Sequence, residues 1–227
     1  MTKKIVICDF DGTITKRDTL DLFLEKYAHP DWHIWEKKWF ALEIGSRECI
    51  RKQFDLIENM TQDELDKFLK SVEIDDYFLE FYSLAKKNNV KVAIVSDGFD
   101  LIIDTIMKNN GIDDIDVYTN HLEFKDGEFI MQWPNISMDC KKESGTCKCK
   151  IVNRLKDNYD EVFYVGDSVS DYCVSDKADY LFAKHRLLTY CEEKNIKYIP
   201  YETFNDIIKN ENLGLRNVNN SNTVNIS

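Results

Sequence analysis

The chain has 227 residues, of which 43% are hydrophobic and 12% aromatic, and it carries a formal net charge of −11. This length suits one globular domain with an insert and a sizeable core. The negative charge argues against general binding to nucleic acid or to an anionic membrane, and it requires any phosphate-binding site to be positive locally.

The amino-terminal residues predict a protein without a targeting signal. No stretch approaches the roughly 20 apolar residues that are needed to cross a bilayer. Met1-Thr2-Lys3-Lys4 leads directly into an apolar segment, which leaves no room for a signal peptide. We therefore expect a cytoplasmic protein that binds neither nucleic acid nor a membrane.

The first predicted element is a buried strand, Lys4–Cys8, followed by the sequence DFDGT. Asp9 and Asp11 then lie at the carboxyl end of the sheet, where open α/β sheets bind ligands. Two crowded carboxylates repel each other, and a divalent cation resolves the repulsion. Gly12 permits a tight turn, and Thr13 offers a hydroxyl and an N–H to an anion. The motif suits phosphoryl transfer through an aspartate, although by itself it also describes an ordinary acidic turn.

The region 16–87 lacks strand signals and shows helical periodicity. Trp32, Trp35 and Trp39 recur at helical spacing, and such an aromatic stripe is typical of packing inside a helical bundle. We therefore predict a helical insert between the first strand and the second.

The rest of the chain alternates strands and helices, which predicts a parallel sheet with right-handed crossovers. The predicted strands are Lys91–Val95, Glu161–Val165, Tyr180–Ala183 and Ile196–Pro200. The predicted helices are Leu101–Asn109, Lys150–Lys156, Tyr172–Lys177 and Arg186–Lys194. A β-hairpin is expected at about 117–135, with its turn at Lys125-Asp126-Gly127. The Asn- and Ser-rich segment 211–227 is expected to be disordered.

The second predicted strand ends in Ser96-Asp97-Gly98, which we assign to phosphate binding. The hydroxyl of Ser96 can donate to a phosphate oxygen, and Gly98 lets the backbone come close. A turn of this composition is common, so the signal is weak alone.

Three cysteines cluster before the helix predicted at Lys150, namely Cys140, Cys147 and Cys149. Together with His121 they could hold zinc, but their spacing lacks the paired C-x2-C geometry of zinc sites. The simpler interpretation is a set of reduced cysteines lining a loop near the active site. The other cysteines are interpreted as small core residues in a reducing compartment: Cys8, Cys49, Cys173 and Cys191.

A lysine near the same helix start, either Lys148 or Lys150, could neutralise a phosphate and an aspartate nucleophile. Further along the chain, the strand Glu161–Val165 is followed by GDSVSD, which adds Asp167 and Asp171 to the same sheet edge. Asp167 could complete a magnesium shell, whereas either acid could instead cap the next helix.

With these four motifs in view, the sequence resembles the haloacid dehalogenase superfamily of aspartate-nucleophile phosphatases, from about Ile5 to Ile208. Lys148 matches the third motif better than Lys150, because Ile151 and Val152 then follow it by three and four residues. The resemblance implies a Rossmann-like, doubly wound parallel sheet with a helical cap of the phosphoserine-phosphatase-like branch. It divides the chain into a core at 1–15 and 88–210, a cap at 16–87 and a tail at 211–227.

The resemblance also implies a two-step mechanism. Asp9 would attack phosphorus and form an aspartyl-phosphate, while Asp11 would act as general acid and then base. Mg²⁺ would be held by Asp9, the carbonyl of Asp11 and Asp167.

The remaining motif residues would support that centre. Ser96, Lys148 and the backbone around Gly12 would bind the phosphate oxygens. Ser168 and Asp171 would orient the metal's waters or Lys148.

The substrate is implied to be a small phosphate ester. The hairpin, the Gly145-Thr146-Cys147-Lys148 segment and Leu181-Phe182-Ala183 resemble the methionine-salvage phosphatases that act on 2-hydroxy-3-keto-5-methylthiopentenyl-1-phosphate. Asp97 stands where that subfamily is expected to have glycine, and it resembles the phosphocholine and phosphoethanolamine phosphatases instead.

A phosphoserine substrate and a non-catalytic role are also compatible with the sequence. For phosphoserine, Asp18 and Arg51 would be the cap acid and base, although both could be plain helix-surface charges. A phosphate-binding module without catalysis would belong to a different functional class. For the assembly, a homodimer is one expectation.

Overall fold

A seven-stranded sheet with the order β4-β3-β2-β1-β5-β6-β7 forms the centre of the computed structural model, which describes residues 2–140 and 142–216. All neighbouring strands are parallel except β3 and β4, which form an antiparallel hairpin. The strands are β1 (Lys4–Cys8), β2 (Lys91–Phe99), β3 (Asp116–Lys125), β4 (Glu128–Gln132), β5 (Glu161–Gly166), β6 (Tyr180–Ala183) and β7 (Ile199–Pro200).

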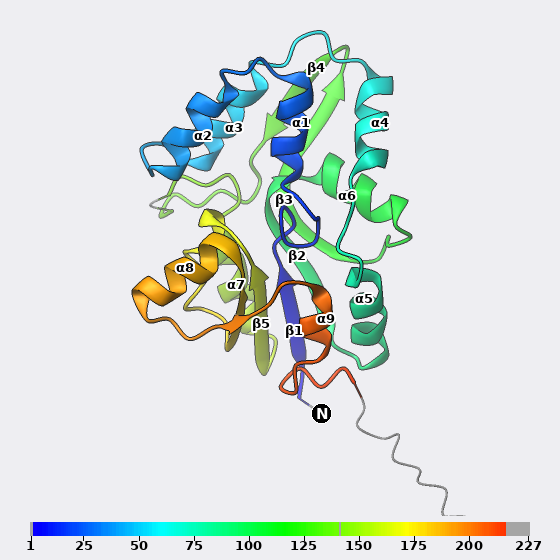
Figure 1. Ribbon diagram of the computed structural model, residues 1–227, viewed down its shortest axis with the longest axis vertical. Helices are drawn as coiled ribbons and strands as arrows, with labels where there is room; N and C mark the ends of the chain where they lie inside the picture. The colour runs from blue at the N-terminus through cyan, green and yellow to red at the C-terminus, as the bar shows by residue number, and fades with distance from the viewer. Residues whose placement is uncertain (1, 141, 217–227) are drawn as a thin grey trace, which may run out of the picture.

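Helices cover both faces of this sheet (Figure 1). In chain order they are α1 (Thr19–Tyr27), α2 (Trp32–Phe40), α3 (Ser46–Phe54), α4 (Gln62–Ser71), α5 (Phe78–Lys87), α6 (Asp100–Asn109), α7 (Lys148–Lys156), α8 (His185–Lys194) and α9 (Phe204–Ile208). A short 3-10 helix, η1 (Val169–Asp171), follows β5.

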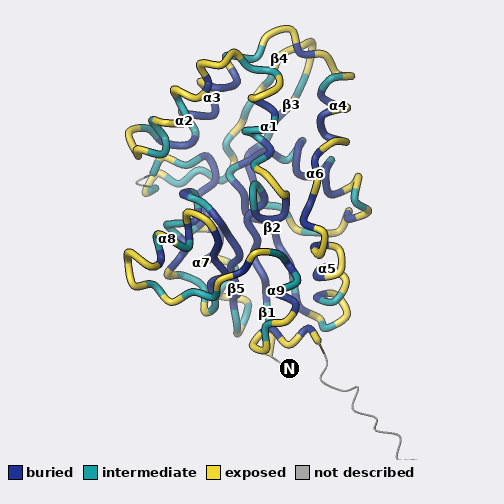
Figure 2. The backbone as a smooth tube through the Cα atoms, in the orientation of Figure 1, coloured by how far each residue is buried: buried dark blue, intermediate teal, exposed yellow. Residues whose placement is uncertain are grey.

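Strand β1 shows why the fold is doubly wound. Successive strand residues point to opposite faces of a sheet. Ile5 and Ile7 therefore join the core on the side of α7 and α8, whereas Val6 and Cys8 join the core on the side of α5, α6 and α9. Figure 2 shows this central strand mostly buried, and its residues from Ile5 to Cys8 are all buried. The predicted fold class, an α/β sheet with helices on both faces and a helical insert, is confirmed.

The helices α1 to α4 lie beyond the carboxyl ends of the strands and surround the β3–β4 hairpin (Figure 1). Phe129 of the hairpin packs edge-on against Phe23 of α1 and Phe54 of α3, with ring centroids 5.9 and 5.1 Å apart. The predicted hairpin and its turn are confirmed, and β3 also pairs with β2 as part of the main sheet. The hairpin is thus both a sheet edge and the inner support of the helical insert.

The helix α5 belongs to the sheet side of the molecule. The chain leaves the sheet and returns to it at an isolated bridge between Thr15 and Ile74. Beyond that bridge, Phe78 and Phe81 of α5 each lie 4.9 Å from the ring of Phe204 in α9. The division of the chain at residue 87 remains a prediction, but the last helix of the region 16–87 packs on the core and not among the cap helices.

Several predicted boundaries differ from the structure. Strand β2 continues past Val95 to Phe99, β7 begins at Ile199 rather than Ile196, and α7 begins at Lys148 rather than Lys150. The helix predicted at Tyr172–Lys177 is wrong, because this segment forms turns after η1. The side chain of Asp171 accepts the N–H groups of the loop before it, which holds that loop in a tight 3-10 turn instead of a longer helix.

The predicted disordered tail is wrong over its first residues. Leu213 and Leu215 are buried in the core beside α9, because two apolar side chains there cover the end of the sheet. The remainder of the tail, 217–227, lies outside the described residues. In the part of the chain that the structure describes, none of the helices combines the length and the apolar character that a membrane span requires.

Candidate active site

Asp9 follows β1 directly and lies at the centre of a buried polar cluster. Its Oδ1 accepts hydrogen bonds from the N–H of Phe10 and from Nζ of Lys148, both at 2.7 Å. Its Oδ2 has one weaker contact, with the hydroxyl of Ser170 at 3.4 Å. Burial raises the pKa of Asp9 well above its usual range, and repulsion from Asp171 adds to this effect while Lys148 opposes it.

Lys148, the first residue of α7, is the positive charge of this cluster. Only 2% of it is exposed, whereas Lys150 points into solvent. Its Nζ also lies 2.8 Å from Oδ1 of Asp171 and 2.9 Å from the hydroxyl of Ser170. Burial alone would lower the pKa of Lys148, but the two carboxylates outweigh burial and raise it, so the lysine is charged. The structure therefore places Lys148, and not Lys150, beside Asp9.

Asp171 organises the loop after β5. Its carboxylate is fully buried and accepts hydrogen bonds from the hydroxyl of Tyr164 at 2.6 Å and from the N–H groups of Asp167 and Ser168 at 2.9 and 3.2 Å. A side chain at Gly166 would meet this carboxylate, since its Cβ would lie 2.5 Å from Oδ2. These contacts occupy the oxygens of Asp171 and place its two neighbours.

The carboxylates of Asp9, Asp167 and Asp171 could hold a divalent cation. One oxygen from each lies within 4.8 Å of the others, and all three residues are buried. The oxygens of Asp171 already accept four donors, so Asp9 and Asp167 are the better ligands. Oxygen-only donors of this kind fit Mg²⁺. The contribution of the Asp11 carbonyl stays a prediction.

The turn after Asp9 supports Asp167 and leaves few donors for an anion. The hydroxyl of Thr13 donates to Oδ1 of Asp167 at 3.0 Å, and its N–H donates to the carbonyl of Phe10. The N–H of Gly12 donates to the hydroxyl of Thr15. In this structure the turn uses these donors internally, so phosphate binding by Thr13 and the N–H of Gly12 stays a prediction.

Gly12 has a different role. Its φ is +69°, and a Cβ there would lie 2.7 Å from Oδ2 of Asp167. Glycine is required both by the left-handed backbone and by the close approach of the carboxylate.

Asp11 lies between the sheet and the cap. Its Oδ1 accepts hydrogen bonds from the N–H and the hydroxyl of Thr19 at the start of α1. Burial raises the pKa of Asp11, and the bonds from Thr19 offset part of the increase. A carboxyl group with a raised pKa can carry a proton near neutral pH, as a general acid must.

The three residues predicted at the end of β2 have unequal roles. Ser96 is buried and accepts the N–H of Gly98 at 2.9 Å. A Cβ at Gly98 would lie 2.9 Å from Oδ2 of Asp11, so glycine allows the acid to approach. Both residues line the cavity described below.

Asp97 links separate parts of the chain. Its carboxylate accepts hydrogen bonds from the N–H of Thr146 at 2.7 Å, from Nδ2 of Asn120 at 3.2 Å and from the hydroxyl of Ser46 at the start of α3. A carboxylate that offers no donor would repel a phosphate. Asp97 lines the cavity described below, but its carboxylate connects α3 to the sheet, and its predicted phosphate-binding role stays a prediction.

A cavity of about 600 Å³, measured with its open mouth, lies between the sheet and the cap. Asp9, Asp11, Ser96, Ser168 and Ser170 line it from the sheet side. The cap supplies the opposite wall, which includes Asp18, Leu20, Asp21, Glu36, Trp39, Cys49, Ile50 and Gln53.

Of the two predicted cap residues, only Asp18 reaches this cavity. It caps α1 by accepting the N–H groups of Leu20 and Asp21 at 2.9 and 3.0 Å, and burial followed by repulsion from Asp11 raises its pKa. The prediction for Arg51 is wrong, because its side chain is exposed and does not line the cavity.

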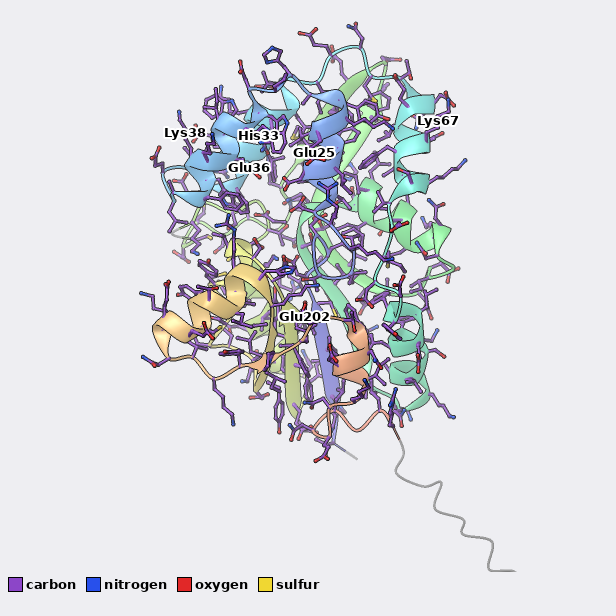
Figure 3. The ribbon with its side chains drawn as sticks, in the orientation of Figure 1. Glu25, His33, Glu36, Lys38, Lys67 and Glu202 are labelled. Carbon is purple, nitrogen blue, oxygen red and sulfur yellow. The ribbon has the colours of Figure 1, made fainter. Side chains whose placement is uncertain are left out.

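Three polar residues of the cap wall, Asp21, Glu36 and Gln53, were not predicted from the sequence. Burial, with repulsion from Glu36 and Asp11, raises the pKa of Asp21 to about 7. Figure 3 shows Glu36 on α2 and Glu25 on the neighbouring α1. Gln53 follows the buried Ile50 at a spacing of three on α3, and this helical periodicity is the signal that could have indicated it.

The cysteines near α7 do not gather around His121. The Sγ atoms of Cys147 and Cys149 are 3.5 Å apart, whereas Nδ1 of His121 lies 2.6 Å from Oδ2 of Asp100. Among residues 2–140 and 142–216, the group of three or more metal-binding side chains that does come together is the aspartate cluster described above.

Comparison with known proteins agrees with this geometry. The sequence matches the haloacid dehalogenase-like hydrolase family over residues 6–175. It is 35% identical over 205 residues to a 2-hydroxy-3-keto-5-methylthiopentenyl-1-phosphate phosphatase of Bacillus cereus, covering 89% of this chain and 93% of that protein. A protein of the same name from Bacillus thuringiensis subsp. konkukian is 32% identical over 204 residues, with the same coverage.

Solved structures give the same fold at lower identity. A phospho-aspartyl intermediate analogue of phosphoserine phosphatase superposes with a TM-score of 0.70 at 20% identity, covering 92% of this chain and 98% of that chain. A substrate-bound phosphoserine phosphatase superposes with a TM-score of 0.67, also at 20% identity. At this level of identity the likeness supports the fold alone.

Proposed function

Because the chain belongs to the haloacid dehalogenase-like hydrolases and its relatives are phosphatases, we propose that it hydrolyses 2-hydroxy-3-keto-5-methylthiopentenyl-1-phosphate by way of an aspartyl-phosphate. The observation that carries the proposed chemistry is the buried ion pair of Lys148 with Asp9, beside Asp167. An acid so placed at the end of β1 can act as a nucleophile only if its charge is balanced, and Lys148 supplies that balance.

In the first step, Oδ2 of Asp9 attacks phosphorus in line, because Oδ1 is held by Lys148 and the N–H of Phe10. The bond between phosphorus and the ester oxygen breaks, and Asp11 gives its proton to the leaving alcohol. Asp11 is suited to this role because it lines the cavity beside Asp9 and its burial raises its pKa. In the second step, Asp11 accepts a proton from the water that attacks the aspartyl-phosphate, so Asp9 and phosphate are released.

Ser96, Ser170 and Lys148 lie around the position of the transferred phosphoryl group. Ser96 and Ser170 line the cavity and can donate to phosphate oxygens, while the charge of Lys148 offsets the charge that develops on them. Asp9 and Asp167 would hold Mg²⁺, which when bound neutralises and orients the phosphate.

Two observations support the proposed substrate. Relatives with 35% and 32% identity over most of the chain carry this activity in their names. The cap wall also presents Leu20, Trp39 and Ile50, which can receive an apolar methylthio group.

A phosphate ester of an amine is the second candidate. Asp21 and Glu36 face the same cavity, and repulsion from Glu36 adds to the raised pKa of Asp21. A ligand with an ammonium group would relieve that repulsion, as in phosphocholine or phosphoethanolamine.

The test is phosphate release from a panel of esters with and without Mg²⁺, using the Asp9→Asn variant as the blank. The panel contains the salvage intermediate, phosphocholine, phosphoethanolamine, phosphoserine and pyridoxal phosphate. We expect Mg²⁺-dependent release that falls by at least about 10³-fold in the variant, since removal of a nucleophile has effects of this order. Equal turnover by a folded Asp9→Asn protein would refute the nucleophile, and the best ester decides between the two substrate classes.

A further inference from the structure

Gln53 is a polar side chain in the cap wall that the mechanism above does not use. It lies in α3, is only 5% exposed, and lines the cavity together with Asp9 and Ser96. Its backbone carbonyl accepts the N–H of Leu56. Its side-chain carboxamide makes no hydrogen bond to another residue within 2–140 and 142–216.

The Gln53 side chain is buried as a whole, but its carboxamide is not among the sealed polar atoms that lack a partner, so this group reaches the cavity. The group has two N–H donors and an acceptor oxygen, and buried side-chain polar atoms are paired in the large majority of cases. Cys49 and Ile50 lie on the same helix face. The thiol of Cys49 is a weak hydrogen-bonding group and Ile50 has none, so neither residue can pair with the carboxamide of Gln53. The open direction is the cavity, and the partner must therefore be a water or part of a ligand.

The charges around Gln53 decide which ligand group fits it. A second anionic group is disfavoured, because Asp18, Asp21 and Glu36 line the same wall. An ammonium group would pair with these acids in preference to a neutral amide. The ligand group that fits the carboxamide is therefore an uncharged oxygen. A carbonyl can accept a hydrogen bond from the amide N–H, and a hydroxyl can accept from the N–H or donate to the amide oxygen.

We propose that Gln53 determines specificity by binding an uncharged hydroxyl or carbonyl oxygen on the carbon chain of the phosphate ester. This inference rests on the proposed function and deepens it, since it selects hydroxyketone phosphates over alkyl and amine phosphates. A site that hydrogen-bonds a substrate oxygen discriminates strongly against the analogue without that oxygen, because its own polar groups are then left unpaired.

The test compares two ligands that differ only in those oxygens. Dihydroxyacetone phosphate and propyl phosphate have the same number of carbons, and calorimetric titration gives their affinities for the Asp9→Asn protein, which does not turn them over. Phosphocholine and inorganic phosphate are titrated beside them, at one fixed Mg²⁺ concentration. We expect the Gln53→Met change to reduce the preference for dihydroxyacetone phosphate over propyl phosphate by about 10-fold or more, and to leave the affinity for inorganic phosphate within about 3-fold.

Two further variants control for effects on folding. Gln62→Met makes the same chemical change at an exposed position of α4, where the amide donates to Asp66, and should leave the preference unchanged. Gln53→Glu keeps the size of the side chain but removes both N–H donors, and should reduce the preference as Gln53→Met does. Thermal unfolding of each variant shows whether the comparison is made on folded protein.

Each outcome separates this inference from the proposed function. An unchanged preference in folded Gln53→Met, or tighter binding of phosphocholine than of dihydroxyacetone phosphate, overturns the inference even if the enzyme hydrolyses esters. Absence of binding by both three-carbon esters overturns it as well. A preference that depends on Gln53 in a protein that hydrolyses no ester keeps the inference and removes the proposed function.

Discussion

Gly12 is the residue whose backbone conformation determines the position of a proposed metal ligand, Asp167. Its positive φ and the 2.7 Å approach of a Cβ to Asp167 mean that any side chain would displace a proposed metal ligand. Thr13 holds the other oxygen of the same carboxylate. The orientation of Asp167 therefore depends on two residues of the loop after β1.

We predict that Gly12→Ala raises the Mg²⁺ concentration needed for half-maximal phosphatase activity by about 10-fold, the usual effect of disturbing the partners of a metal ligand. It should also lower stability by about 1–3 kcal/mol, because alanine is strained at this φ. Gly111→Ala is the matched control, since its φ is +77° and no atom lies within 4 Å of its Cβ. It should lose similar stability with no change in Mg²⁺ dependence. Equal Mg²⁺ dependence in the two variants would contradict the role assigned to Gly12.

Asp21 provides a prediction of pH dependence. Folding raises its pKa from 3.8 to about 7, first through burial and then through Glu36. The folded protein thus binds this proton more tightly than the unfolded chain, so its contribution to stability is present below about pH 4 and is lost as the pH rises through about 7.

Asp21→Asn should therefore stabilise the protein relative to wild type at pH 8 and should have little effect at pH 4. The gain at pH 8 should be on the order of a few kcal/mol at most, because the pKa shift of Asp21 sets its upper limit. Denaturant unfolding at both pH values measures this difference. Asp139→Asn, at an exposed position, is the control and should show no such dependence. A gain in stability that is the same at both pH values would show that Asp21 ionises normally.

At the scale of elements, the junction between α3 and the end of β2 depends on Asp97. The hydroxyl of Ser46 in α3 donates to its carboxylate, and the N–H of Thr146, two residues before Lys148, donates to the same group. Cap, sheet and the start of α7 are therefore joined at one side chain. Gly45, just before α3, lets this helix approach the loop that precedes α7, since a Cβ there would lie 2.6 Å from Cβ of Glu143.

We predict that Ser46→Ala speeds amide hydrogen exchange in α3 and costs about 1 kcal/mol of stability, the usual effect of losing one buried hydrogen bond. Ser71→Ala removes a hydrogen bond inside the cap, to the carbonyl of Phe68, and serves as the control. Exchange in α3 should not respond to it. If α3 exchanges at the wild-type rate in Ser46→Ala, the junction does not hold the cap.

At the scale of the molecule, the active site concentrates negative charge in a protein whose net charge is already −11. Asp9, Asp167 and Asp171 share a buried cluster in which Lys148 provides the neighbouring positive charge. A divalent cation that binds only the folded state would relieve the remaining repulsion and stabilise the whole domain.

Mg²⁺ should therefore raise the melting temperature, and chelation with EDTA should lower it and abolish phosphatase activity without unfolding the protein. At Mg²⁺ concentrations about 100-fold above its Kd, the stabilisation should reach about 2.7 kcal/mol. Asp167→Asn should remove most of this shift, whereas Asp176→Asn, an exposed acid beside Lys177, should not. A melting temperature insensitive to Mg²⁺ in wild type would argue against the metal site.

The strands of the sheet and the acids at their ends can be predicted from the sequence alone. An apolar run followed by Asp or Gly is a local pattern, and it shows where a strand ends without any knowledge of the tertiary structure. Asp9, Asp11, Asp167 and Ser96 were predictable for this reason, and so was the hairpin turn at Gly127. Lys148 could be chosen over Lys150 only through the resemblance to the family, whose third-motif lysine precedes apolar helix residues by three and four.

Which side chains face one another depends on tertiary packing. Arg51 and Gln53 are two residues apart on α3, about 200° around the helix axis, so the spacing places them on different faces. Packing then determines that the face of Gln53 lines the cavity and that Arg51 meets solvent. Thr13 and Asp97 bind partners that are far away in the sequence, namely Asp167 and the pair Ser46 and Thr146. Hydrogen bonds over such separations depend on how elements pack, and no local pattern of residue types contains that information.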